Sequence, residues 1–232
     1  MKVVQIRIKV LIKENIHADD IQPKVCGLID YSFSKRQELL DMHNENKYKF
    51  YCFDSPYPLE KDKVYKKGKI YTLTIRTIDF NLAEFFSNSL LDVQTYFIKA
   101  LSSEIKIIPQ RHIEKIYSVT PAVIKNDTGY WKDSMSINDY ERRLKENLIK
   151  KYNAITGSKI DEDFELFNKI ELKNRKPISV KYKKIKLLGD KLNLYIADNQ
   201  RAQDLAYMAI GCGLNEMNPR GFGFVNYKFM DM

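Results

Sequence analysis

The sequence contains little cysteine and histidine and has no long hydrophobic run. Only three of its 232 residues are cysteines, Cys26, Cys52 and Cys212, and they lie far apart with no paired spacing. This spacing argues against a zinc site and indicates reduced thiols. No apolar run approaches the roughly 20 residues of a membrane helix, and residues 1–10 alternate like a strand rather than forming a signal peptide. We therefore expect a cytoplasmic protein without a membrane partner.

Positive charge and aromatic rings are abundant. Lysine and arginine number 39 against 30 acidic residues, a formal net charge of +9, and the chain has 15 tyrosines and 12 phenylalanines. Basic side chains interleaved with rings can neutralise phosphates and stack on bases, which favours a nucleic-acid partner. On charge alone, a lysine-rich surface without a binding role is an equal alternative.

Glycine is concentrated near the C-terminal end. Four of the nine glycines fall between Gly211 and Gly223, in a segment entered from a helical pattern and followed by a strand pattern. Glycine allows positive φ and the close approach of another backbone, so such a loop can direct several N–H groups at a phosphate. Together with the basic composition, this loop points to nucleic acid.

The order of predicted elements is the same in both halves of the chain. Periodicity in the first half predicts strands at 2–12, 47–53, 69–76 and 105–108, and helices from Pro23 to Phe33, at 34–42 and at 82–91, with a polar connection at 54–68. The second half has strands at 111–124, 164–172, 178–188 and 221–229, and helices at 136–152 and 199–209. We therefore predict an α+β protein of two tandem ferredoxin-like βαββαβ domains, residues 1–110 and 111–232.

Three stretches carry a family resemblance. Residues 213–223, Gly-Leu-Asn-Glu-Met-Asn-Pro-Arg-Gly-Phe-Gly, resemble a tail motif G-L-G-E-K-N-S-x-G-F-G, with Asn215 at the second glycine. Asn adopts the left-handed conformation more readily than most residues. Residues 47–55, shortly after His43, and residues 118–125 with 140–152 are similar to two further family segments. The chain thus resembles the CRISPR-associated endoribonucleases that process repeat RNA, in the repeat-associated mysterious protein superfamily.

The resemblance implies a reaction and its residues. Such enzymes cut RNA without metal or cofactor, through attack of the 2′-hydroxyl on the adjacent phosphate, leaving a 2′,3′-cyclic phosphate and a 5′-hydroxyl. His43 would be the general acid or base, Lys49 would stabilise phosphate charge, and Tyr31 would orient the scissile nucleotide. The alternatives are that His43 covers the core beside Leu39, that Lys49 lies on a solvated strand face, and that Tyr31 is a coincidence in a tyrosine-rich chain.

The other histidines and the basic segments complete the candidates. His17 or His112 could replace His43 as the catalyst, or both could be surface residues. The predicted RNA-binding residues are Gly213, Asn215, Arg220, Gly221 and Gly223 in the loop, and Lys173, Arg175, Lys181, Lys183 and Lys184 around one strand. Arg220 is the best single candidate for a phosphate contact. Arg142, Arg143, Lys145, Lys150 and Lys151 suggest a basic helix face. A solvated charged surface is the alternative for each of them.

Three functions fit this pattern. The first is a metal-independent endoribonuclease acting on precursor CRISPR RNA, with repeat RNA as its partner. The sequence contains no HxH pair of the kind that would indicate a metal site. The second is a non-catalytic RNA-binding subunit that assembles with other CRISPR-associated effector subunits. The third is an RNA-recognition protein unrelated to CRISPR. Gly221–Val225 partly matches the aromatic-rich strand motif of such domains. The sequence leaves the oligomeric state open, and a homodimer is one state it allows.

Overall fold

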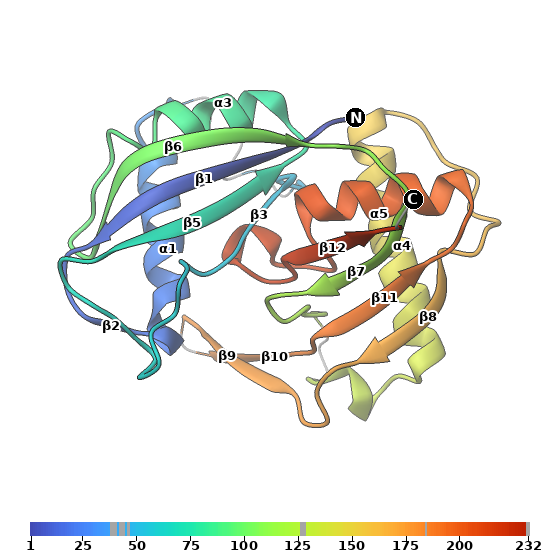
Figure 1. The fold of residues 1–232 in the computed structure, drawn as a ribbon. Helices are drawn as coiled ribbons and strands as arrows, with labels where there is room; N and C mark the ends of the chain where they lie inside the picture. The colour runs from blue at the N-terminus through green and yellow to red at the C-terminus, as the bar shows by residue number, and fades with distance from the viewer. Residues whose placement is uncertain (38–40, 42–44, 46, 126–128, 184, 231–232) are drawn as a thin grey trace.

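Each half of the chain folds around a four-stranded antiparallel sheet (Figure 1). The computed structural model describes residues 1–37, 41, 45, 47–125, 129–183 and 185–230. The first half consists of β1 (Val3–Ile12), α1 (Ala18–Phe33), β3 (Tyr51–Phe53), β5 (Ile70–Thr77), α3 (Phe80–Asn88) and β6 (Ile98–Ile108). Its strands lie in the order β3-β5-β1-β6. This is the ferredoxin-like arrangement, in which the first and third strands occupy the centre.

The second half repeats this arrangement. It consists of β7 (Ile113–Ser118), α4 (Ile137–Thr156), β8 (Phe167–Leu172), β11 (Leu192–Ile196), α5 (Gln200–Cys212) and β12 (Val225–Phe229). The order β12-β7-β11-β8 again has the first and third strands in the centre. The remaining elements of the two halves are short: β2 (Ile16–His17), β4 (Val64–Tyr65), β9 (Ile178–Tyr182), β10 (Ile185–Gly189), η1 (Trp131–Asp133) and η2 (Asn218–Arg220). The predicted fold class is confirmed.

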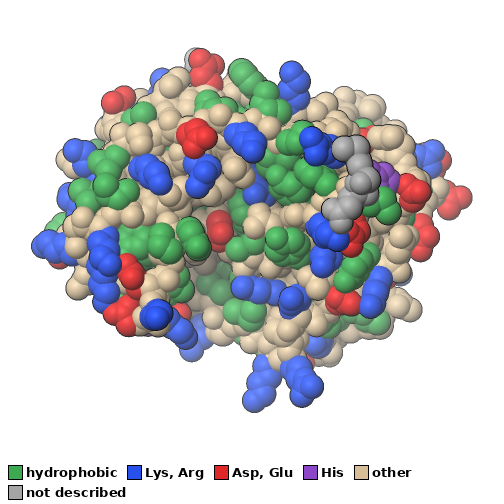
Figure 2. All heavy atoms as spheres, in the orientation of Figure 1, with side chains coloured by type: hydrophobic (Ala, Val, Ile, Leu, Met, Phe, Trp, Pro, Cys, Tyr) green, Lys and Arg blue, Asp and Glu red, His purple; other side chains and the backbone are tan. Residues whose placement is uncertain are grey.

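Alternation in β1 decides which face of the first sheet is covered. Ile6, Ile8 and Val10 are fully buried against α1 and α3, which pack on one face. Arg7 and Lys9 point to the other face and are exposed, as period two requires. Figure 2 shows lysine and arginine side chains spread over both halves of the molecule, with a hollow between them. In the described part of the chain, no helix is long and apolar enough to cross a membrane.

Several predicted elements have different limits. The α1 helix begins at Ala18, so Pro23 lies inside it rather than in its first turn, and His17 caps it by accepting a hydrogen bond from the Asp19 N–H. Only Tyr51–Phe53 of the strand predicted at 47–53 pairs, because Phe50 has a φ of 51° that ends the extended run. Residues 38–40 and 42 of the short helix predicted at 34–42 lie outside the described residues.

The largest topological error concerns residues 178–188. We predicted one strand, but the chain reverses at Lys183, with a φ of 51°, to form the separate hairpin β9–β10. The third strand of the second sheet is instead β11, which pairs with both β7 and β8. An uninterrupted β pattern does not distinguish one long strand from a hairpin that has no glycine at its turn.

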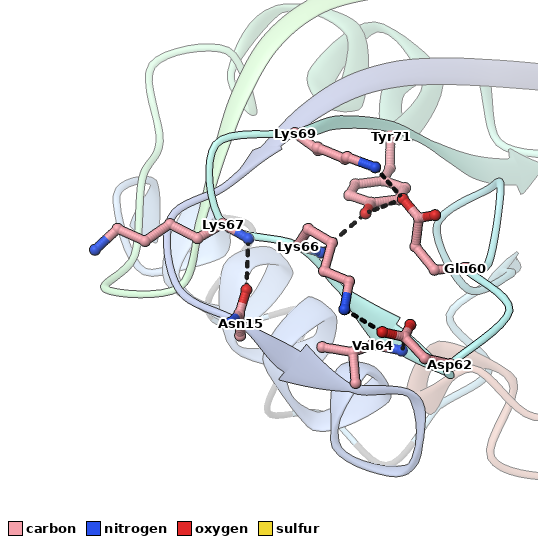
Figure 3. A network of polar contacts seen from close by, with 8 residues as sticks. All are labelled: Asn15, Glu60, Asp62, Val64, Lys66, Lys67, Lys69 and Tyr71. Atoms are coloured by element: carbon pink, nitrogen blue, oxygen red, sulfur yellow. Dashed lines mark hydrogen bonds and ion pairs between the residues drawn. The ribbon is translucent and has the colours of Figure 1, made fainter.

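A polar network orders the long connection between β3 and β5 (Figure 3). The Tyr71 hydroxyl accepts from the Lys66 N–H at 2.9 Å and donates to Glu60 at 3.0 Å, and Lys69 pairs with the same carboxylate. The Lys67 N–H donates to Asn15 at 2.8 Å. These bonds attach the polar segment to both the sheet and the turn that precedes α1.

The two halves share buried contacts. The Tyr207 hydroxyl of α5 donates to the Ile108 carbonyl at 2.6 Å and accepts from the Val3 N–H at 3.1 Å. The guanidinium of buried Arg76 donates to the Val225 carbonyl at 2.5 Å and to Asn226 at 2.8 Å. Val3 and Ile108 of the first half also belong to the apolar core that is formed mainly by the second half. The division of the chain into two domains at residue 110 thus stays a prediction. The two halves pack against each other without a gap.

We predict that Tyr207→Phe lowers the free energy of unfolding by about 1–3 kcal/mol, because it leaves a buried carbonyl and a buried N–H without their partner and changes the volume little. Urea denaturation measures the loss. Tyr57→Phe is the matched control, since this side chain is 73% exposed. Equal stability of the two variants would contradict the proposed bridge.

Candidate functional site

A cleft of about 870 Å³ lies where both halves meet the glycine-rich loop. One wall is formed by the segment that leads into β3, and the other by α4 and the loop between α5 and β12. The described lining residues that carry charge or amide groups are Glu45, Lys47, Lys49, Lys125, Asn147, Lys151, Asn215, Glu216, Asn218 and Arg220. Lysine predominates, so the cleft suits an anionic ligand.

A buried lysine holds the loop in place. Lys151 of α4 is 3% exposed, and its ammonium donates to the carbonyls of Gly213 and Asn215 at 3.0 and 2.8 Å and to Oδ1 of Asn218 at 2.7 Å. These acceptors satisfy all three N–H groups of the ammonium. Burial lowers the pKa of Lys151 below its usual value. A buried cation needs such a full set of partners.

The loop backbone explains its residue types. A Cβ at Gly223 would lie 2.1 Å from the Leu214 carbonyl oxygen, and Gly223 has a φ of 65°. Asn215, which replaces a glycine of the tail motif, has a φ of 53°. The Asn218 amide donates to the carbonyls of Leu214 and Phe222. Glycine and asparagine at these positions therefore let the loop fold back on itself.

The expected phosphate cradle of loop N–H groups is largely wrong. The N–H groups of Leu214 and Gly223 donate to the carbonyls of Gly223 and Pro121, and the Glu216 N–H donates to Val123. Gly213, Asn215, Gly221 and Gly223 are buried. In this structure these four residues shape the loop. Their contact with RNA stays a prediction.

Lys49 lies in the cleft, as its predicted role requires. Its ammonium donates to the Glu45 carbonyl at 2.7 Å. Burial, together with Lys47, lowers the pKa of Lys49, while Glu45 opposes the shift. Tyr48 is 38% exposed beside it and lines the same cleft. A partly buried cation and a ring thus lie on the wall opposite the loop.

Arg220 links the loop to the first half. Its guanidinium donates to Asp30 of α1 at 2.6 Å, and the Gln22 amide donates to its carbonyl. The side chain still lines the cleft, with 24% of it exposed. Tyr31, next to Asp30, is 49% exposed and is not among the cleft-lining residues.

The three histidines differ in what can be said of them. His43 lies outside the described residues, so its predicted role stays a prediction. His17 caps α1, and its Nδ1 lies 3.4 Å from an Asp19 carboxylate oxygen. Nε2 of His112 lies 3.2 Å from Asp198. Neither of these two lines the cleft.

The remaining predicted RNA-binding lysines form a second group. Lys181 and Lys183 are exposed on the hairpin and line a separate hollow of about 440 Å³ with His17, Lys24 and Phe97. Lys181 also pairs with Asp20 of α1 at 3.4 Å. Figure 2 shows basic side chains projecting from the lower edge, where β9–β10 lies in Figure 1. Lys173 and Arg175 are exposed at the base of this hairpin. Lys184 lies outside the described residues.

Comparison with known proteins identifies the family. The family model described as CRISPR associated protein Cas6, C-terminal, matches residues 103–227, more than half of the chain. The chain belongs to the Cas6 family. The family predicted from the sequence is confirmed.

Cas6 relatives cover nearly the whole chain. One from Methanocaldococcus jannaschii, called CRISPR-associated endoribonuclease Cas6 2, is 23% identical over 96% of this chain and 99% of its own. Two solved structures share the fold with a TM-score of 0.71. "CRISPR associated protein Cas6" is 20% identical, and "An RAMP protein binding different RNA substrates" is 16% identical; each comparison covers 97% of this chain and 99% of the other.

The basic helix face predicted for this Cas6-family protein needs correction. Lys151 is buried, and Lys145 donates to the carbonyls of Glu162 and Phe164. Arg142 pairs with Asp139 and Glu146 of its own helix. The spacing could have indicated that Lys151 is buried, since it follows Leu148 by three residues on the apolar stripe of α4. Sequence reasoning also missed Lys125 and Asn147 as cleft residues.

We predict that Lys151→Met lowers the free energy of unfolding by about 3 kcal/mol, because it leaves three buried oxygens without a donor. Thermal or urea unfolding measures the change. Lys150→Met is the matched control on the same helix, since its side chain is 67% exposed. A loss no larger than that of the control would show that the loop does not depend on this ammonium.

Proposed function

We propose that this Cas6-family protein is an endoribonuclease that cuts precursor CRISPR RNA within its repeats, without a metal ion. In this proposal the 2′-hydroxyl attacks the adjacent phosphate, and the products carry a 2′,3′-cyclic phosphate and a 5′-hydroxyl. Membership of the family and the endoribonuclease name of the M. jannaschii relative support RNA processing. The reaction chemistry rests on the resemblance and on the cleft.

The lysine-lined cleft is the observation that carries the proposal. The cleft is lined by Lys49 on one wall and by Lys125 and Arg220 on the opposite side. Its volume is large enough for a nucleotide and its phosphates. Attack on the phosphate creates additional negative charge on its oxygens, which nearby ammonium groups stabilise. We assign that role to Lys49, because burial on its wall keeps it close to the cleft and reduces its hydration.

Proton transfer is assigned to His43. Imidazole titrates near neutral pH, so one residue can act as acid or base at cellular pH. His43 precedes Lys49 by six residues in the chain, and residues 47–53 are similar to the family signature of a histidine followed by a K-x-F-x-x-F segment, with Phe50 and Phe53 in place and Tyr48 where the signature has lysine. Tyr31, on the exposed side of α1, is proposed to orient the scissile nucleotide from outside the cleft.

RNA binding extends beyond the cleft in this proposal. The hairpin lysines Lys181 and Lys183, with Lys173 and Arg175 at its base, form a second basic surface. Lys184, which lies outside the described residues, stays a predicted RNA-binding residue. Two basic surfaces suit a polyanion longer than one nucleotide. Repeat RNA is therefore the proposed partner, with the cut site at the cleft and a flanking part of the repeat at the hairpin.

The second candidate is a non-catalytic RNA-holding subunit of an effector complex. It is favoured by Arg220, because the arginine proposed to contact phosphate is already bonded to Asp30 in the protein. In this case the cleft would bind RNA without cutting it. Cleavage assays distinguish the two functions directly.

We expect the wild-type protein to cut a cognate repeat RNA in excess EDTA. His43→Ala should slow cleavage by roughly 100-fold or more, the usual contribution of a general acid or base. A single 2′-deoxy substitution at the cut site should abolish cleavage and leave binding nearly unchanged, since it removes the nucleophile. Cleavage of the deoxy substrate at the normal rate would refute the mechanism, and tight binding without cleavage would support the second candidate.

We expect Lys49→Ala to reduce the single-turnover cleavage rate by roughly 100-fold, because it removes one charge that stabilises the transition state. RNA affinity, measured by filter binding, should fall much less. Lys61→Ala changes the same charge at an exposed position outside both basic surfaces and serves as control. Equal cleavage rates for the two variants would remove Lys49 from the mechanism.

A further inference from the structure

A side pocket of about 300 Å³ adjoins the lysine-lined cleft. The two spaces share four lining residues, which are Tyr48, Asn147, Asn215 and Glu216. The rest of the described lining of the side pocket comes from α4. Its volume lies at the lower end of the range for small-molecule sites, which suits a single nucleobase rather than a whole nucleotide.

The side pocket differs from the cleft in its charge. Arg143 and Lys150 of α4 contribute positive charge to its described lining. Glu146 and Glu216 contribute an equal negative charge. The Arg143 guanidinium donates to the Lys125 carbonyl at 2.8 Å and lies 3.4 Å from a Glu216 carboxylate oxygen. A pocket with balanced charges does not select a phosphate. It suits a neutral group that has both hydrogen-bond donors and acceptors.

Two amide oxygens of the side pocket accept no hydrogen bond from a described residue. They are the buried Oδ1 atoms of Asn147 and Asn215. Asn215 is 1% exposed, and its Nδ2 donates to the Tyr140 hydroxyl in the core at 3.4 Å. The Oδ1 atom is therefore the branch of this amide that is left for a ligand. Burial of an acceptor without a donor is unfavourable, and a ligand that donates to it offsets this cost.

The loop itself does not require the Asn215 side chain. The tail motif has glycine at this position, and the φ of 53° at Asn215 is one that glycine adopts readily. Lys151 binds the backbone carbonyl of Asn215, which glycine would also supply. The amide is thus an addition of this chain to the loop, placed beside the cleft.

Guanine matches the polar groups of the side pocket better than the other bases do. Its Watson–Crick edge has two adjacent donors, N1–H and the 2-amino group, where adenine, cytosine and uracil each have one donor group. These two donors match the two amide oxygens of Asn147 and Asn215. Guanine O6 and N7 are acceptors that arginine and lysine side chains bind, and Arg143 and Lys150 supply such groups.

Tyr48 provides an aromatic ring at the junction of the side pocket and the cleft. Its side chain is 38% exposed, and its ring contacts that of Phe50 with a centroid distance of 6.1 Å. Unpaired RNA bases stack on such rings while their edges are read by polar side chains. A base and its phosphate can therefore lie in the adjoining spaces together.

We propose that the side pocket binds one guanine base of the RNA, with N1–H and the 2-amino group donating to Asn147 and Asn215 and the ring stacked on Tyr48. This inference rests on the proposed RNA substrate but not on its cleavage. The pocket selects a guanine next to the phosphate held in the cleft. It therefore determines which nucleotide of the repeat comes close to Lys49.

The hollow beside the β9–β10 hairpin lacks these properties. None of its described lining side chains has a buried acceptor without a donor. Lys24, Lys181 and Lys183 give it an excess of positive charge, and Lys24 lies 3.7 Å from the centre of the Phe97 ring. That hollow suits contact with the RNA backbone, whereas the side pocket suits the edge of a base.

Fluorescence anisotropy with short, labelled oligouridine RNAs tests the proposal. The probes carry guanosine, inosine, adenosine or cytidine at one central position, and inosine differs from guanosine only by the missing 2-amino group. We expect wild-type protein to bind the guanosine probe about tenfold more tightly than the other three. Asn215→Gly should bind the guanosine and inosine probes equally, because it removes one acceptor and keeps the backbone carbonyl for Lys151. Asn147→Ala should reduce the preference in the same way.

Asn138→Ala is the matched control, because Asn138 is exposed in the first turn of α4 and does not line the side pocket. This variant should keep the full preference for guanosine. Equal affinity of wild-type protein for the guanosine and inosine probes would overturn the proposal, and this comparison depends on no variant. An Asn215→Gly protein that still prefers guanosine would overturn it as well.

A cleavage assay on repeat RNA with the same protein separates this inference from the proposed function. Cleavage without any preference for guanosine over inosine would reject the side pocket and leave the endoribonuclease standing. A preference for guanosine without cleavage would support the side pocket and count against the endoribonuclease.

Discussion

The ammonium of Lys151 is the interaction on which the cleft depends. It enters the interior from α4 and binds three oxygens of the segment 213–218. A buried charge is tolerated only with such a complete set of partners, so the helix and the loop constrain each other. Because the loop forms one wall of the cleft, the position of that wall is set by a helix residue more than sixty positions earlier in the chain.

The same loop is anchored on its other side. Arg220 binds Asp30 of α1, and the Gln22 amide binds the Arg220 carbonyl, so the loop bridges the two ferredoxin-like halves. Tyr207 and Arg76 add buried hydrogen bonds across the same junction. A site built at such a junction can hold groups from both halves at fixed distances, which proton transfer and charge stabilisation both require.

Two basic surfaces of different character follow from this architecture. The cleft contains partly buried cations with defined hydrogen-bond partners, Lys49 among them. The hairpin instead presents lysines that are exposed to solvent. The first arrangement suits chemistry at one phosphate, and the second suits salt-sensitive contact along a backbone. The proposed cleavage and the proposed grip on the repeat therefore use different physical means in different places.

The sequence by itself determined the fold class, because the alternate buried residues of β1 and the buried residues at every third or fourth position of α4 follow directly from the order of apolar residues. It misplaced the third strand of the second half, which is β11 and not residues 178–188. It also determined the family through the tail motif, in which Asn215 and Gly223 have positive φ and Gly223 leaves no room for a Cβ. Periodicity could not reveal that residues 178–188 turn back at Lys183, or that His17 caps a helix. Only the tertiary structure decided that Lys151 is buried, that the loop N–H groups bond internally and that Arg220 faces Asp30. Those outcomes depend on contacts between residues far apart in the chain, and no local pattern encodes the partner of a buried charge.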